Sequence, residues 1–223
     1  MGSHMSYLEL LEDKQVQQYY NFIQKTANNC PIDHSLEHIK RTVENAKILA
    51  DIFQIKNADL QNLLSACTLH DIGYVHSRKS HAMFGAIKCR SILRQHNYSA
   101  ENIEIISSII ASHNSFNANC YDFDISIIAM LADKLDLCEY RYNEQFIGAE
   151  NTFKSLLSIE YISFKKNDKS VDFYINCKPF ASIKLLKNCP LIYKLGDYLD
   201  LASDYLQTQI KLNFNIRKAL TKI

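Results

Sequence analysis

The sequence predicts a mainly α-helical protein, on the basis of three observations. Only five Gly and three Pro occur in 223 residues, so few positions interrupt a helix. Through the first 140 positions, apolar residues recur at intervals of three and four, which places them on one face of a helix. Hydrophobic residues make up 47% of the chain, enough to bury a full core. We therefore expect one globular domain with a small appendage.

Six helices are predicted in the first part of the chain, each from its apolar face. They cover residues 6–28, 36–53, 58–72, 81–93, 102–113 and 124–140. Asp33 or Ser35 can cap the second helix, because both side chains accept hydrogen bonds from the free N–H groups of a first helical turn. Gly73 can end the third helix, since Gly readily adopts the left-handed conformation that often follows a helix.

The pattern changes after Gly148. Residues 159–164 and 171–175 are short β-branched and aromatic runs separated by a polar stretch, which indicates a β-hairpin. A terminal helix over residues 190–213 is predicted from its spaced leucines. We therefore divide the chain into a remnant of an affinity tag at residues 1–5, a helical domain at 6–148 and a hairpin-plus-helix extension at 149–223. The extension could shape a pocket or support a homodimer.

The composition argues against several classes of protein. A formal net charge of +1 gives no global attraction to nucleic acid or to an anionic membrane. No apolar stretch is long enough to span a bilayer, and no charged start followed by an apolar segment indicates secretion. The seven Cys residues are odd in number and form no CxxC pair, which is typical of reduced, buried thiols. We expect a cytoplasmic protein without a membrane partner.

Four side chains that can bind a metal lie far apart in the sequence. His38 is in the second predicted helix, His70 and Asp71 are adjacent at the end of the third, and Asp133 is in the sixth. Imidazole and carboxylate together suit Zn, Fe, Mn or Co, and an incomplete ligand shell leaves room for an activated water. A buried carboxylate without a partner is costly, so these residues could meet in a core only if a metal or hydrogen bonds satisfied them. The set is therefore a candidate for a catalytic divalent metal site.

The local sequences around these four residues are HSLEHIKR, LHDIG and LADKLD. In order, spacing and flanking residues they resemble the HD-domain superfamily of metal-dependent phosphohydrolases, over roughly residues 20–145. The resemblance implies an HD-type helical bundle in which His38, His70, Asp71 and Asp133 bind the metal. It also implies that a metal-activated water hydrolyses a phosphate ester, with Asp71 as the central catalytic residue.

Two further histidines fall where the two-metal branches of this family place additional ligands: His81 in SHAMFGA and His113 in ASHNS. The resemblance then implies that Asp71 bridges two ions, one held by the other ligands named above and one by His81 and His113. The alternative is a single ion, with these two histidines contacting a substrate phosphate or capping helices. The cofactor is thus one or two divalent ions among Fe, Mn, Co, Ni, Zn and Mg.

The pattern differs at three points from the cyclic-di-nucleotide phosphodiesterases called HD-GYP. Where those proteins have a pair of histidines, this chain has His113-Asn114. Tyr74 stands in place of the lysine of HDIGK, and the GYP portion is missing. Hydrolysis of cyclic dinucleotides is therefore not the expected activity.

Phosphoryl transfer also requires positive charge near the ligands. Arg41 lies one helical turn after His38 and Lys134 directly follows Asp133, so both are candidate catalytic cations. Arg78 and Lys79 are further candidates, and the alternative for all of these cations is an ordinary exposed position. Asp136 could orient a ligand from outside the ligand shell, or be solvated. Three other histidines are expected to be surface or capping residues: His34, His76 and His96.

The expected function is hydrolysis of a phosphomonoester or phosphodiester bond in a small, nucleotide-like substrate. One alternative is a regulatory module that keeps the metal and senses a nucleotide without turnover. Another is a nucleic-acid-processing protein recruited by the Lys-rich hairpin, which contains Lys165, Lys166 and Lys169. Acidic residues interrupt that hairpin and the net charge is near neutral, so nucleic acid is not the expected partner.

Overall fold

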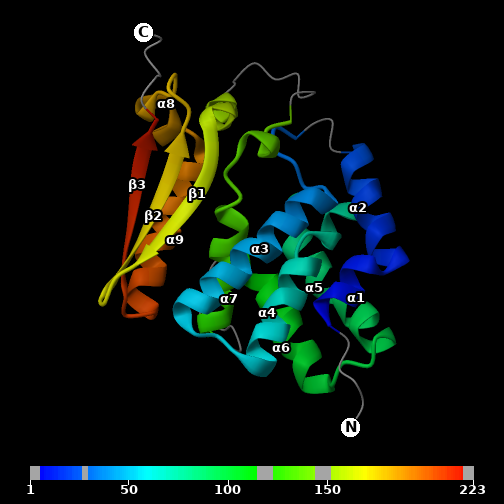
Figure 1. Cartoon of the computed structure of the whole chain (residues 1–223). Coiled ribbons are helices and arrows are strands. Elements are labelled where there is room, and N and C mark those ends of the chain that lie inside the picture. Colours follow the sequence, from blue (N-terminus) through cyan, green and yellow to red (C-terminus); the bar gives the residue numbers. More distant parts are fainter. Residues whose placement is uncertain (1–5, 27–29, 115–122, 144–151, 218–223) are drawn as a thin grey trace. The chain divides into compact units, whose positions relative to one another are not determined.

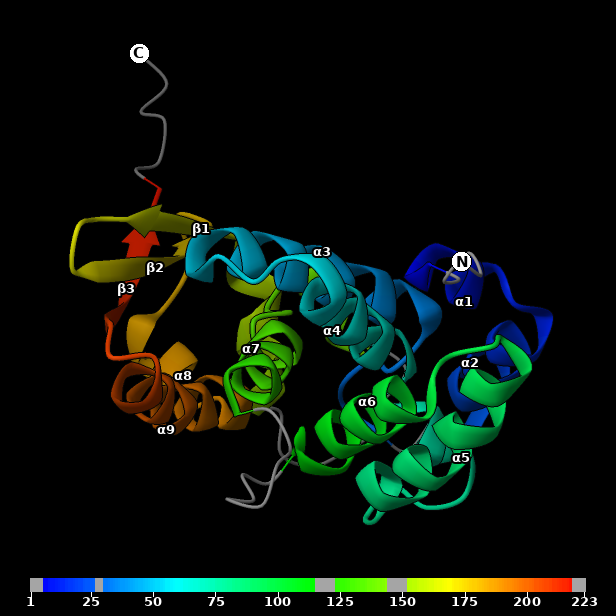
Figure 2. The same ribbon diagram turned by 90° about the horizontal axis from the view of Figure 1, so that it is seen from below.

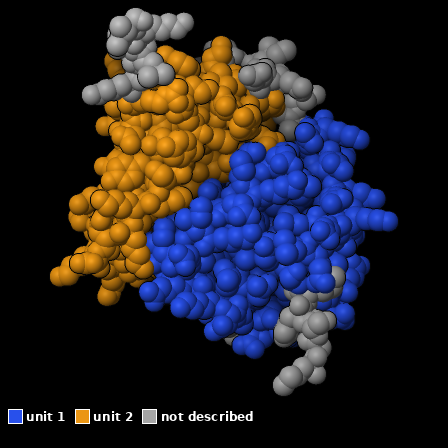
Figure 3. All heavy atoms as spheres, in the orientation of Figure 1, with its two compact units in different colours: residues 1–27, 34–133 blue, residues 28–33, 134–223 orange. Residues whose placement is uncertain are grey.

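A computed structural model describes residues 6–26, 30–114, 123–143 and 152–217. The chain forms two compact units, which Figure 3 shows in different colours. The first unit contains residues 1–27 and 34–133, and the second contains residues 28–33 and 134–223. The predicted mainly α class is confirmed. The predicted domain boundary at residue 148 and the tag remnant at residues 1–5 lie outside the described residues and stay predictions.

The first unit is helical (Figure 1). Its elements are α1 (Tyr7–Glu12), α2 (Lys14–Thr26), α3 (Leu36–Phe53), α4 (Asn57–Leu69), the 3-10 helix η2 (Ile72–Val75), α5 (His81–Gln95), α6 (Ala100–Ser112) and α7 (Phe123–Lys134). Helices α5 and α6 pack side by side, as do α3 and α4 (Figure 2). The apolar faces that predicted these helices form the core, because residues such as Ile39, Leu64 and Ile106 are buried.

The N-terminal segment is two helices, so the single helix predicted for residues 6–28 is wrong. Asp13 ends α1 with an extended backbone conformation. Its carboxylate then accepts hydrogen bonds from the backbone N–H groups of Gln15 and Val16, at 2.8 and 2.9 Å. These are the free donors of the first turn of α2. The break therefore follows from the capping preference of one Asp inside an otherwise helical pattern.

Two predicted helix ends were also wrong. Helix α4 ends at Leu69, and Gly73 lies inside η2 without a positive φ, so Gly73 is not a left-handed cap. Helix α7 ends at Lys134 rather than near Tyr140. Beyond α7, the buried side chain of Asp136 accepts a hydrogen bond of 3.3 Å from the buried guanidinium of Arg141. Asp136 thus forms a buried ion pair within the second unit, instead of being solvated.

The second unit contains a three-stranded sheet. Its elements are the 3-10 helices η3 (Glu139–Arg141) and η4 (Thr152–Ser158), the strands β1 (Ile159–Lys166) and β2 (Ser170–Cys177), the helices α8 (Ile183–Lys187) and α9 (Pro190–Tyr205), and the strand β3 (Gln209–Ile216). The predicted hairpin is confirmed, because β1 pairs antiparallel with β2. The terminal helix is shorter than predicted, and β3 pairs parallel with β2 after it. Parallel neighbours need a crossover, which α8 and α9 provide.

The cysteines agree with a reduced protein. Cys30, Cys67, Cys89, Cys138, Cys177 and Cys189 are free thiols, and Cys120 lies outside the described residues. All of these free thiols except that of Cys138 are buried. Among the residues that the structure describes, none of the helices combines the length and the hydropathy that a membrane span requires.

Candidate metal centre

The six predicted metal ligands all lie in the first unit, at or near helix ends. His38 is in the first turn of α3, His81 is the first residue of α5, and Asp133 precedes the last residue of α7. His70 directly follows α4 and is joined to Asp71, and His113 directly follows α6. The exposed fraction of each residue is 6% or less. The structure therefore brings together every predicted ligand in one buried cluster.

Three of the histidines are oriented by the same local contact. Nδ1 of His70, of His81 and of His113 donates a hydrogen bond to the carbonyl three residues earlier, at 2.9, 2.7 and 2.6 Å. For His70 and His113 this carbonyl is one of the free acceptors at the end of a helix. Because Nδ1 carries the proton, Nε2 of each neutral ring presents a lone pair to the cluster.

One half of the cluster forms around His38. Its Nε2 lies 3.3 Å from Nε2 of His70 and 3.3 Å from Oδ1 of Asp133. Oδ2 of Asp71 lies 3.6 Å from Nε2 of His38 and 3.3 Å from Nε2 of His70. Oδ1 of Asp133 is 3.8 Å from Nε2 of His70. The ligand atoms of His38, His70 and Asp133 all lie within 4.8 Å of one another and could hold one ion.

The other half forms around the second oxygen of Asp71. Oδ1 of Asp71 lies 3.6 Å from Nε2 of His81 and 3.7 Å from Nε2 of His113. The two Nε2 atoms are 3.2 Å apart. Asp71 therefore directs one carboxylate oxygen to each half of the cluster, which is the arrangement that a bridging carboxylate requires.

These separations are equal to or a few tenths of an ångström longer than those between ligands of one divalent ion. Two ligand atoms about 2.1 Å from one metal lie about 3.0 Å apart at an octahedral angle and about 3.4 Å apart at a tetrahedral angle. The separations within the two halves are 3.2–3.8 Å. Nε2 of His81 and Nε2 of His113 both present lone pairs, and a cation between them would remove the repulsion of these lone pairs. The cluster could thus hold a metal, and metal binding by the six residues stays a prediction.

The electrostatics of the cluster favour a cation. Burial alone would raise the pKa of Asp71, but the neighbouring His70 and His34, with the hydrogen bond from Nδ1 of His34, hold it well below its usual range. Burial acts to lower the pKa of His70, yet the carboxylates of Asp71 and Asp133 raise it above its ordinary value. The carboxylate of Asp71 therefore stays ionised and attracts positive charge, from a proton on His70 or from a metal.

Acidification should destabilise the metal-free protein in a defined window. Burial lowers the pKa of His113 from 6.5 to about 4, so between these values the unfolded chain binds a proton that the folded chain does not. Stability from this group is present above pH 6.5 and is lost as the pH falls toward 4, by about 3 kcal/mol at most. His70, with its raised pKa, acts in the opposite direction above pH 6.5. Urea unfolding in EDTA across this range should show a smaller pH dependence in His113→Gln, and an identical dependence would contradict the assignment.

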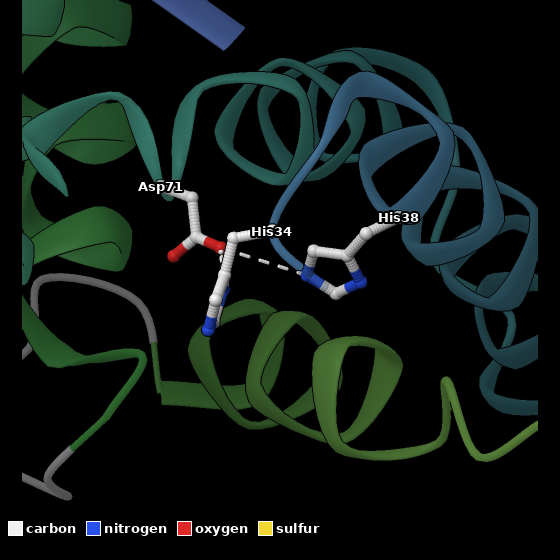
Figure 4. A group of neighbouring side chains, drawn as sticks. All are labelled: His34, His38 and Asp71. Carbon is white, nitrogen blue, oxygen red and sulfur yellow. Dashed lines mark hydrogen bonds and ion pairs between the residues drawn. The ribbon is translucent and has the colours of Figure 1, made fainter. Parts of the chain in front are cut away.

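His34 belongs to the cluster, so its predicted surface or capping position is wrong. It is buried, with 6% exposure, and its Nδ1 donates a hydrogen bond of 2.6 Å to Oδ2 of Asp71. Figure 4 shows His34 and His38 on the same side of this carboxylate. Burial lowers the pKa of His34, which favours the neutral ring. His34 precedes the cap of α3, so no helical spacing in the sequence indicated this position.

Two more residues contact His81 and were not predicted as part of the site. The ring of Tyr74 stacks on the ring of His81, with centroids 4.0 Å apart and an interplanar angle of 29°. The side-chain amide of Asn114 contacts Nε2 of His81. Both residues are partly exposed, so the cluster is nearest to solvent beside His81.

The remaining predicted residues occupy varied positions. Arg41 is partly exposed on α3, three residues after His38. Lys134 lies in the second unit, and its ammonium is 5.9 Å from the ring centroid of Tyr198. Their catalytic roles stay predictions. Arg78 and Lys79 are exposed before α5, His76 is also exposed, and His96 is 3.1 Å from a carboxylate oxygen of Asp13.

A comparison with known protein families agrees with the position of this cluster in the sequence. The family model described as HD domain matches residues 35–139. No curated protein matches the sequence. Among solved structures, a predicted HD superfamily hydrolase from an uncultured Thermotogales bacterium is similar, with 23% identity and a TM-score of 0.45, over 63% of this chain and 86% of that chain. The segment matched by the family model contains the six clustered residues, so residues 35–139 of this chain form an HD domain.

Proposed function

We propose that this chain is a metal-dependent phosphohydrolase that cleaves a phosphomonoester or phosphodiester bond in a small, nucleotide-like substrate. The observation that carries the proposal is the position of Asp71, with one carboxylate oxygen facing the His38 half and the other facing the His81 half. A buried set of imidazoles and carboxylates at these separations supports a hydrolytic metal centre better than a structural role.

A divalent ion bound in the cluster supplies an activated water and withdraws charge from the phosphoryl oxygens. The protein's own side chains prepare the site for this ion. The backbone carbonyls fix Nδ1–H of His70, His81 and His113, so that their Nε2 lone pairs are oriented before any ion binds. Burial of Asp71 and Asp133 keeps water from screening their charge. The site is thus preorganised for a cation.

Substrate is proposed to approach beside His81. Tyr74 and Asn114 are partly exposed there, whereas His38 is fully buried. Arg78 and Lys79 are exposed just before α5, and the carbonyl of Arg78 accepts the hydrogen bond from Nδ1 of His81. A guanidinium and an ammonium on this segment of the chain suit the oxygens of a phosphate group. This supports a phosphorylated substrate over a neutral one.

The test is elemental analysis followed by a panel of activity assays. Anaerobically purified protein should contain one or two equivalents of a divalent metal, and EDTA should remove both metal and activity. The panel compares nucleoside monophosphates, deoxynucleoside triphosphates, dinucleoside polyphosphates and cyclic dinucleotides, each with Fe, Mn, Co, Ni, Zn and Mg. Release of phosphate or of a nucleoside phosphate from one class supports the proposal. Tight nucleotide binding without turnover under every metal would identify a sensing module instead.

A further inference from the structure

Tyr74 contacts His81 in one half of the cluster and His34, the histidine that is hydrogen-bonded to Asp71. Its ring stacks on His81 at 4.0 Å between centroids, and it also faces the ring of His34 at 4.3 Å. Its hydroxyl is 3.1 Å from Nε2 of His34. Because Nδ1–H of His34 donates to Asp71, Nε2 of the neutral ring must be an acceptor, and the Tyr74 hydroxyl is the donor. The chain of contacts therefore runs from Tyr74 through His34 to Asp71.

We propose that Tyr74 is a positioning residue of the metal centre: its hydroxyl fixes the ring of His34, and His34 in turn holds Oδ2 of Asp71. Without the hydroxyl, His34 can exchange its tautomer or rotate, and the carboxylate loses the donor that sets its orientation. Both oxygens of Asp71 then lose their alignment with the histidines. The phenol ring also packs against His81, so it supports the second half through a separate contact. This inference rests on the metal centre of the proposed function.

The chain offers substitutions that separate these contacts. Tyr74→Phe removes the hydroxyl and keeps the ring on His81. In His34→Asn, the side-chain amide stands where Nδ1 was and can still donate to Asp71, but no atom remains to accept from Tyr74. His34→Phe removes both hydrogen bonds. The contacts of Tyr74 and His34 can therefore be removed one at a time.

The experiment is a double-mutant cycle on metal affinity. Co²⁺ is titrated into the metal-free full-length chain, and the dissociation constant is taken from the visible absorption of bound Co²⁺, whose band shape also reports ligand geometry. Partners that orient metal ligands are typically worth about 10-fold to 100-fold in affinity. We expect Tyr74→Phe to weaken binding about 10-fold in the wild-type background and to have no effect in His34→Asn. Equal effects in both backgrounds would show that Tyr74 does not act through His34, and would overturn the inference.

Rescue provides a second measure. Co²⁺ affinity should decrease from wild type to His34→Asn to His34→Phe, because Asn retains the donor to Asp71. Equal losses in the two variants would also overturn the inference. The matched controls are Tyr98→Phe, which removes a hydroxyl bonded to Ser65 at 2.9 Å, and His96→Asn, which removes an imidazole paired with Asp13. Both should bind Co²⁺ like wild type, because the partners removed, Ser65 and Asp13, are not members of the cluster.

The outcomes separate this inference from the proposed function. If the wild-type chain binds no divalent metal, both fail. If it binds Co²⁺ and Tyr74→Phe binds equally well, only the inference fails. If it binds metal and responds to the cycle as expected but cleaves no phosphate ester, only the proposed function fails.

Discussion

Replacing Asp71 with Asn will abolish metal binding in both halves of the cluster and, with it, turnover. Asn has the same shape as Asp but no charge, and its nitrogen cannot act as a ligand, so one half loses its oxygen whichever way the amide lies. The four surrounding Nε2 atoms of His38, His70, His81 and His113 would then face one another across a neutral group. We expect a loss of at least about 1000-fold in kcat/KM, since the ion supplies several kcal/mol of transition-state stabilisation.

The measurement combines Co²⁺ titration and elemental analysis with the assay on the substrate that the panel identifies. Asp51→Asn is the matched control, because Asp51 is exposed on α3, the helix that carries His38. The control should retain metal and activity. Asp71→Ala should also lose both, and urea unfolding in EDTA shows whether either variant is folded. Stoichiometric metal and wild-type turnover in a folded Asp71→Asn protein would refute the proposed centre.

The positions of the predicted ligands could be recognised in the sequence because the pattern around each ligand depends only on nearby residues. Apolar spacing placed His38, His81 and Asp133 in helices and His70 and His113 at helix ends, and the structure agrees. Such patterns depend on residues three and four positions apart, so they can be recognised without knowledge of the tertiary structure. The resemblance to HD domains then ordered the ligands into one set.

His34 could not be assigned by the same reasoning. It precedes the cap of α3, where no helical pattern constrains its direction, and its partner Asp71 is 37 positions later in the chain. The pairing depends on how α3 packs against α4, a tertiary arrangement that periodicity does not contain. Tyr74 was noted only as a departure from a lysine, because its contact with His34 spans 40 positions.

Strand β3 was missed for a different reason. Leucines at helical spacing continue through α9 to Leu206. Because of this pattern, the predicted helix extends beyond Tyr205, where α9 ends. Residues 209–216 read QIKLNFNI, in which apolar and polar residues alternate, as expected for a strand with one buried face. Ile210 fits both the helical spacing and the alternating pattern of a strand. Pairing with β2, which requires the crossover through α9, decides between them.

Replacing Gly73 with Ala will displace His81 and weaken metal binding even though Gly73 contacts no metal. A Cβ at this position would lie 2.0 Å from the carbonyl oxygen of His81 and 2.4 Å from the backbone nitrogen of Gly85. Both are backbone atoms of α5, so no side-chain rotation relieves the overlap, and α5 must move away from η2 by about 1 Å or more. Misplacement of a catalytic group by 1 Å can cost about 100-fold in rate, and overpacking costs about 1–3 kcal/mol of stability.

The glycines of this chain provide a graded series for this test. At Gly85 a Cβ would lie 3.1 Å from Cγ2 of Ile110 and 3.2 Å from the carbonyl oxygen of His70, a milder overlap. At Gly196 in α9 it would meet nothing within 4 Å, so Ala there should raise helix stability by about 0.5–1 kcal/mol. Loss of Co²⁺ affinity and of stability in urea should therefore follow the order Gly73→Ala, Gly85→Ala, Gly196→Ala, with no loss in the last. Wild-type affinity in Gly73→Ala would mean that the position of His81 does not limit metal binding, and that the second half of the cluster is not part of the centre.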